Sequence, residues 1–106
     1  MAWILLVVAG LFEVVWAFAM KQSDGFTKLI PSVVTIVGML ISIVLLSLSM
    51  RSLPLGTAYT IWTGIGALGA FIVGIVFLGE QLNFTRVCAA VLILSGLVMM
   101  KMSSSD

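Results

Sequence analysis

The sequence predicts an all-α membrane protein with four transmembrane helices. Of the 106 residues, 62% are hydrophobic and only 8% are charged, and the mean hydropathy is +1.33. A soluble domain of this size needs more charge to cover its surface. Charged and turn-forming residues also divide the chain into apolar stretches, each long enough at ~1.5 Å per residue to cross a hydrocarbon core of ~30 Å. We therefore expect one transmembrane domain over residues 1–106, in the cell membrane.

Polar breaks set the ends of the expected helices. Lys21–Gly25 ends the first, Arg51–Gly56 contains Pro and Gly and separates the second from the third, and Gly79–Asn83 separates the third from the fourth. The expected spans are residues 2–20, 29–50, 57–78 and 86–102. Loops this short connect antiparallel neighbours, so both termini should lie on one side of the membrane. We expect residues 103–106 to fray.

The basic residues give almost no bias in membrane orientation. One side carries Lys21, Lys28 and Arg86, and the other carries Arg51 and Lys101. Cytoplasmic loops normally hold a clear excess of Lys and Arg. A chain with so small an excess can insert both ways round, which suggests that it works with mixed topology.

Composition also argues against several classes of function. The net charge is +1, no basic run is present, and the chain has no His, so nucleic-acid binding is not expected. A single cysteine, Cys88, leaves no set of soft ligands for a metal, and we expect neither metal nor cofactor. No catalytic residue set is predicted. The loop acids Asp24 and Glu80 should be solvated.

Glu13 needs a physical explanation because it lies roughly 3 Å of helix rise from the middle of the first span. A carboxylate there costs at least ~2.5 kcal/mol, and the basic residues all lie at span ends. A proton or a bound cation can neutralise the carboxylate. A site that accepts either, but not both fully, couples the two, as an exchanger does. The alternative is a protonated Glu with a structural hydrogen bond.

Other polar and aromatic residues are candidates to line a cation site with Glu13. Trp16 follows three residues later, and its indole can donate to the carboxylate or face a cation. Ser42 lies near mid-depth in the second span, and Tyr59 and Trp62 are three apart in the third. Alternatively, the two aromatic residues form an interfacial belt, and Ser42 bonds back to its preceding turn.

Small residues suggest where helices meet or bend. Gly66 and Ala70 belong to a small-residue ridge in the third span, and Gly64 and Gly66 offer a bend point. Ala89 and Gly96 are seven apart on one face of the fourth span, as a helix–helix contact requires. Ordinary membrane packing is the alternative explanation for all of them.

One chain supplies one intramembrane carboxylate, so we expect the site to form between two copies. Repulsion between two Glu13 carboxylates favours proton uptake. Two carboxylates also suit a planar cation with many donors, such as guanidinium. With almost no orientation bias, the two copies can lie antiparallel and expose the site to either side in turn.

Several segments, spread over about residues 2–102, resemble the small multidrug resistance family. The matching segments are Ala9–Ala17, Gly25–Thr27 with Pro31 and Ser32, Leu53–Tyr59, and Ile61–Ala70. Trp16 after Glu13 and the run Gly66–Ala70 resemble the guanidinium-exporter branch rather than the quaternary-ammonium branch. Two departures are Gln22 and Thr60, where many members have Tyr and Ala.

The resemblance implies an antiparallel, dual-topology homodimer that exports guanidinium-type cations in exchange for protons across a bacterial inner membrane. It implies a central carboxylate at Glu13. The supporting residues would be Trp16, Ser42, Tyr59 and Trp62, with a bend at Gly64 to Gly66 and a dimer contact at Ala89 to Gly96. The competing interpretations are a quaternary-ammonium exporter of the same fold, a proton-carrying rotor subunit, and a plain channel.

Overall fold

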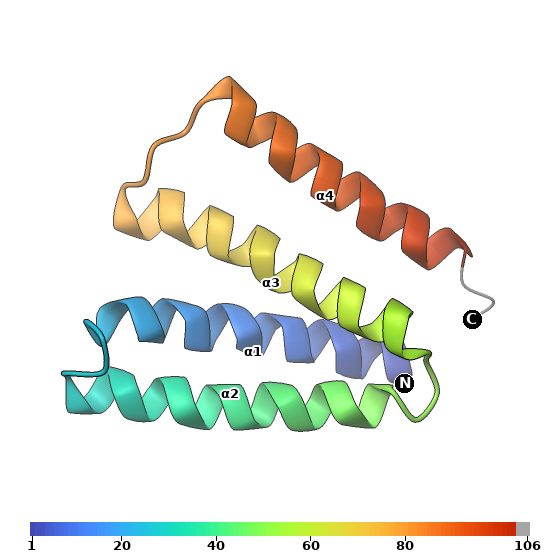
Figure 1. Ribbon diagram of the computed structural model, residues 1–106, viewed down its shortest axis with the longest axis horizontal. Coiled ribbons are helices and arrows are strands. Elements are labelled where there is room, and N and C mark those ends of the chain that lie inside the picture. The colour runs from blue at the N-terminus through green and yellow to red at the C-terminus, as the bar shows by residue number, and fades with distance from the viewer. Residues whose placement is uncertain (104–106) are drawn as a thin grey trace.

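The computed structural model describes residues 1–103, and this part of the chain folds into four α-helices, α1 (Ala2–Gln22), α2 (Leu29–Ser49), α3 (Leu55–Leu78) and α4 (Phe84–Ser103) (Figure 1). Each helix is long and apolar enough to cross a membrane. The predicted fold class is therefore confirmed. The start of α1 and the end of α4 lie at the same end of the bundle, as antiparallel neighbours joined by short loops require.

Helix α1 is at the centre of the arrangement. It packs along α2 on one side and along α3 on another, whereas α2 and α3 meet at few positions. Helix α4 lies along α3 and diverges from it toward the α3–α4 loop (Figure 1). It also touches α1, because Nζ of Lys101 lies 4.4 Å from the centre of the Trp3 ring. Within residues 1–103, none of the residues of α4 is buried. The chain is thus a three-helix unit with a fourth helix attached along one edge.

Three of the four helices extend beyond the apolar stretches that predicted them, and α2 ends one residue early, at Ser49. Lys21 and Gln22 belong to α1, although they were expected in the loop. Helix α3 begins at Leu55 because Pro54 is extended and its carbonyl oxygen accepts the first hydrogen bond of the helix, from the Ala58 N–H at 3.0 Å. Helix α4 begins at Phe84 because the Asn83 side chain accepts the Arg86 N–H at 2.9 Å, as an N-cap does. Charged residues therefore indicate where a helix leaves the hydrocarbon core of the membrane, whereas capping hydrogen bonds determine where the helix itself begins or ends.

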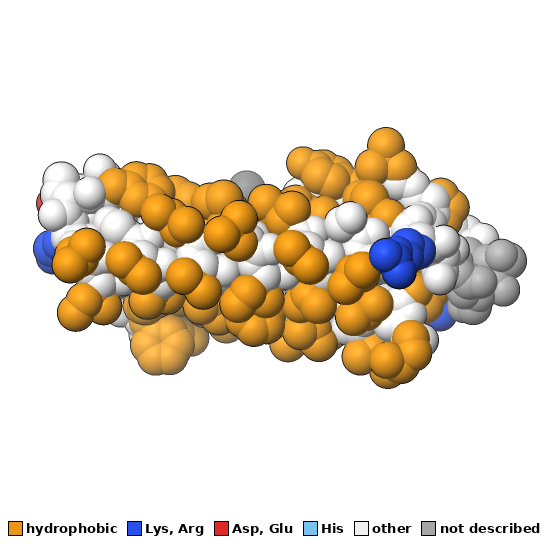
Figure 2. Space-filling view, turned by 90° about the horizontal axis from the view of Figure 1, so that it is seen from below, with side chains coloured by type: hydrophobic (Ala, Val, Ile, Leu, Met, Phe, Trp, Pro, Cys, Tyr) orange, Lys and Arg blue, Asp and Glu red, His pale blue; other side chains and the backbone are white. Residues whose placement is uncertain are grey.

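The outer surface suits lipid. Figure 2 shows the face over α2, where hydrophobic side chains cover the middle and Lys and Arg lie near the two ends. The buried core occupies the half of the bundle nearer the α2–α3 turn, and it contains Leu6 and Ala9 of α1, Leu46 of α2, and Ile61 and Trp62 of α3. Glu13 therefore lies just beyond the packed half, where α1 and α3 begin to leave open clefts.

Candidate functional site

The carboxyl group of Glu13 lies directly on the backbone of α3 at Gly66. Even one methyl group at Gly66 would collide with the Glu13 carboxyl oxygen Oε1. This oxygen is buried and has no hydrogen-bond partner among residues 1–103. A buried polar atom without a partner is costly, so this oxygen is able to accept a hydrogen bond from a further group.

Paired small and large side chains bring α1 and α3 close enough for this contact. Ile65 of α3 packs over Gly10 of α1, at a position where an added methyl group would overlap it. In the reverse sense, Val14 of α1 packs over Gly69 of α3. Glycines let helix backbones approach closely in membranes. The face of α1 that carries Glu13 is therefore fixed against α3.

Ser42 connects three helices through hydrogen bonds. Its hydroxyl donates to the Ala9 carbonyl of α1 at 2.7 Å and accepts the Trp62 Nε1–H of α3 at 2.9 Å. The alternative that Ser42 bonds back to its own preceding turn is therefore wrong. In an α-helix the carbonyl of Ala9 also accepts the N–H of Glu13, four residues later. The Trp62–Ser42–Ala9 chain thus fixes the backbone turn that carries Glu13.

Ser42→Ala is expected to lower the free energy of unfolding by about 1–2 kcal/mol, because the buried Trp62 N–H loses its acceptor. Unfolding in mixed micelles of increasing denaturing-detergent content measures the change. Ser47→Ala, at an exposed serine of the same helix, is the matched control and should change stability little. Equal losses in both variants would contradict a specific role for the hydrogen-bond chain.

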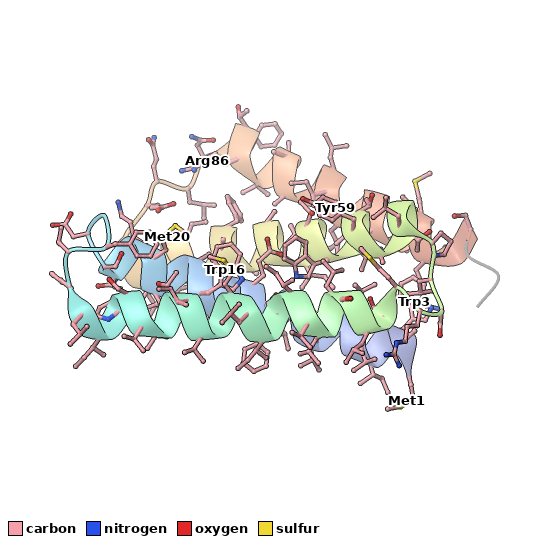
Figure 3. All side chains as sticks on the ribbon, turned by 60° about the horizontal axis from the view of Figure 1, so that its bottom comes forward. Met1, Trp3, Trp16, Met20, Tyr59 and Arg86 are labelled. Atoms are coloured by element: carbon pink, nitrogen blue, oxygen red, sulfur yellow. The ribbon has the colours of Figure 1, made fainter. Side chains whose placement is uncertain are left out.

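Trp16 lies on α1, near the middle of the bundle (Figure 3). It packs on Gly38 of α2, where an added methyl group would be 3.1 Å from the Trp16 Cβ. Its Nε1 is buried without a hydrogen-bond partner in the described chain. The predicted hydrogen bond to Glu13 is thus absent within residues 1–103. Positions three apart differ by about 60° around a helix, so the Cβ of Trp16 lies against α2 while the Glu13 carboxyl group lies against α3.

Tyr59 and Trp62 form an aromatic pair, with ring centroids 5.5 Å apart and planes tilted by 48°. Trp62 is buried and bonded to Ser42 inside the bundle, which is inconsistent with a place in an interfacial belt. Tyr59 is 52% exposed and borders a groove of about 490 Å³ between α3 and α4 (Figure 3). The pair therefore runs from the core to that groove.

The predicted bend and contact residues all lie along α3 and α4. Helix α3 is continuous through Gly64 and Gly66, and Leu97 of α4 fills the space that a side chain at Gly64 would occupy. Ala89 and Gly96 are exposed and border the grooves between α3 and α4. The space around Gly96 is open within the described chain.

Two participants in the site were missed from the sequence. The Ala9 carbonyl gives no signal in a residue pattern, because every residue has one. Gly38 does give a signal: it precedes Ser42 by four residues, so it shares the face of α2 that Ser42 turns toward α1.

Four helices long enough to cross a membrane surround the buried Glu13 oxygen, which has no partner among residues 1–103, and they define a small multi-pass membrane protein. A family model described as Small Multidrug Resistance protein matches residues 1–94. The chain belongs to the small multidrug resistance family.

Relatives with curated names agree with this family. Proteins named Guanidinium exporter from Yersinia pseudotuberculosis serotype I (strain IP32953) and Escherichia coli (strain K12) are each 53% identical to this chain over 104 residues. A third, from Citrobacter freundii, is 52% identical over 104 residues. The alignments cover 98% of this chain and 100%, 99% and 99% of the three relatives. The chain is thus a transporter rather than an enzyme, and a multi-pass protein of the inner membrane.

Proposed function

We propose that this chain exports guanidinium and small substituted guanidinium cations, and that protons and cation compete for Glu13. The observation that carries the proposal is the buried Glu13 oxygen without a hydrogen-bond partner among residues 1–103, in a chain whose basic residues all lie toward helix ends. The names of the relatives support guanidinium as the substrate.

Competition at Glu13 would couple the two ions. A proton neutralises the carboxylate from one side of the membrane, and a guanidinium cation displaces it from the other, through two parallel N–H bonds to the carboxylate oxygens. Trp62 donates its N–H to Ser42, so its ring and that of Tyr59 remain to face the cation. We propose that the Trp16 side chain rotates when the carboxylate becomes charged, so that its N–H, which has no partner among residues 1–103, donates to Glu13.

We further propose that the transporter is an antiparallel homodimer and that the whole chain acts as a single domain in it. A dimer brings a second Glu13 to the site, and the three-to-two division of basic residues lets either orientation form. The exposed face of α4, with Ala89 and Gly96, is the proposed contact between copies. The Gly64–Gly66 segment of α3 is the proposed bend between outward-facing and inward-facing states.

Gly96→Leu should weaken the dimer about tenfold, since overpacking an interface costs on the order of 1–3 kcal/mol. Gly96 has open space around it within the described chain, so a larger side chain should leave the single chain intact. Size-exclusion chromatography with light scattering in detergent measures the fraction of dimer. Ser95→Leu, at the neighbouring exposed position, is the control. An unchanged dimer in Gly96→Leu would place the contact elsewhere.

Proton release on guanidinium binding tests the function. Adding guanidinium to purified protein in weak buffer should release protons at a pH where Glu13 is protonated and release none where it is already charged. In liposomes, a proton gradient alone should drive guanidinium uphill, which a channel does not do. Binding of guanidinium without proton release would reject the coupling. Transport of tetraalkylammonium with no guanidinium flux would favour the quaternary-ammonium alternative.

A further inference from the structure

A cleft between α1 and α3 opens at the loop end of the bundle and ends at Val14, the residue next to Glu13. It has a volume of about 140 Å³. At its inner end lie Val14, which packs over Gly69, and Ala70, one turn after Gly66. At its outer end lie Lys21 of α1 and Glu80, just beyond α3. The lining between these ends is apolar, so the charged groups of the cleft are concentrated at its mouth.

The chain turns Glu80 back toward this cleft. Gly79 has a left-handed backbone with φ of 66°, and the Glu80 N–H then bonds to the Gly74 carbonyl at 3.0 Å. The Glu80 carboxyl group rests against Gly74, where an added methyl carbon would be 2.5 Å from its Oε1. An acid at a helix C-terminus opposes the helix dipole. Stabilisation of α3 therefore does not explain Glu80.

The bases near this loop leave Glu80 accessible. Arg86 donates from Nη1 to the Gln81 carbonyl at 2.8 Å, and its guanidinium lies 5.9 Å from the centre of the Phe71 ring. Lys21 borders the same cleft as Glu80, but within residues 1–103 no ion pair between the two is formed. The carboxylate is thus exposed at the mouth and available to a visiting cation.

We propose that Glu80 is an outer docking site for guanidinium-type cations on their way to Glu13, and that the positive charge of Lys21 weakens this site. The proposal rests on the proposed export function. A carboxylate holds a guanidinium cation by parallel N–H bonds. Eight residues of helix separate Glu13 from Lys21, or about 12 Å. A cation at the mouth is therefore close enough for charge in a low-dielectric cleft to raise its rate of arrival.

The experiment measures initial uptake of labelled guanidinium by proteoliposomes containing the full chain, at a concentration well below saturation. In about 10 mM salt, where the Debye length is ~30 Å, Glu80→Gln should slow uptake about three- to tenfold. In about 150 mM salt the loss should shrink. Lys21→Gln should raise the rate of uptake, and the double variant Glu80→Gln with Lys21→Gln should return toward the wild-type rate.

Asp24→Asn is the matched control, since it removes one acid from the same membrane side but outside the cleft. Its uptake should stay near that of the wild type. An unchanged rate in Glu80→Gln, or an equal loss in Asp24→Asn, would overturn the docking site while leaving export intact. If the wild type itself takes up no guanidinium, the export function fails and the docking site fails with it. Equal elution volumes of all variants would verify folding.

Discussion

Glu13→Gln is expected to abolish guanidinium binding and the proton release that accompanies it. Glutamine matches the size of glutamate, so the side chain still fits over Gly66. The glutamine amide is neutral and does not exchange a proton. It therefore offers no negative charge to attract either a proton or a guanidinium cation. Loss of the charged partner should weaken guanidinium at least ~100-fold. Titration calorimetry in two buffers of different ionisation heat measures affinity and proton release together.

The pH dependence of binding gives a second readout of the same residue. In the wild type, a bound proton neutralises Glu13, so guanidinium affinity should fall as the pH falls. In Glu13→Gln, any residual binding should be independent of pH. Asp24→Asn, which removes an acid from the α1–α2 loop, should keep the wild-type profile. Pumping by Glu13→Gln would show that another group carries the proton.

Gly66→Ala is expected to reduce guanidinium transport by ~10-fold or more, although alanine stabilises most helices. The added methyl group would collide with the Glu13 carboxyl, so the carboxyl group must move from its position over α3. Overpacking of this kind costs on the order of 1–3 kcal/mol. Gly56→Ala is the matched control, because an added methyl group there meets open space within the described chain. Uptake by proteoliposomes compares the two variants.

A second substitution separates displacement of Glu13 from general damage to the helix pair. Aspartate is shorter than glutamate by one methylene, so Glu13→Asp withdraws the carboxyl from Gly66. The double variant Glu13→Asp with Gly66→Ala should therefore transport better than Gly66→Ala alone. If the shorter acid brings no recovery, the defect of Gly66→Ala arises from helix packing and not from Glu13.

Composition predicted a membrane protein, and the positions of the charged and turn-forming residues divided it into four long apolar stretches. Together they predicted the all-α class and the number of spans. Helix ends were harder to predict. Helix α1 continues past Lys21, and α4 starts two residues before the expected position. The hydrophobic pattern indicates which residues contact lipid. Asn83 and Pro54 instead fix the first residues of α4 and α3 by accepting hydrogen bonds from backbone N–H groups, and a hydropathy pattern does not show these bonds.

The geometry around Glu13 was only partly predictable. Residue type and depth identify Glu13 and Ser42, and spacing brings Tyr59 next to Trp62. Spacing along one helix does not say which neighbour each side chain faces. The Cβ of Trp16 packs on α2, whereas the carboxyl group of Glu13 packs on α3. That choice depends on which glycines of the other helices lie opposite.

The wall opposite Glu13 has a consequence for engineering the range of compounds carried. At Gly66 the Glu13 carboxyl group contacts main chain rather than a side chain. No side chain is therefore present there to replace, and any side chain added at Gly66 would collide with the Glu13 carboxyl group. Redesign must work from other walls. In the proposed cation site, Tyr59 and its neighbour Thr60, which border the groove toward α4, would be the positions to substitute, because neither contacts the Glu13 carboxyl group through Gly66.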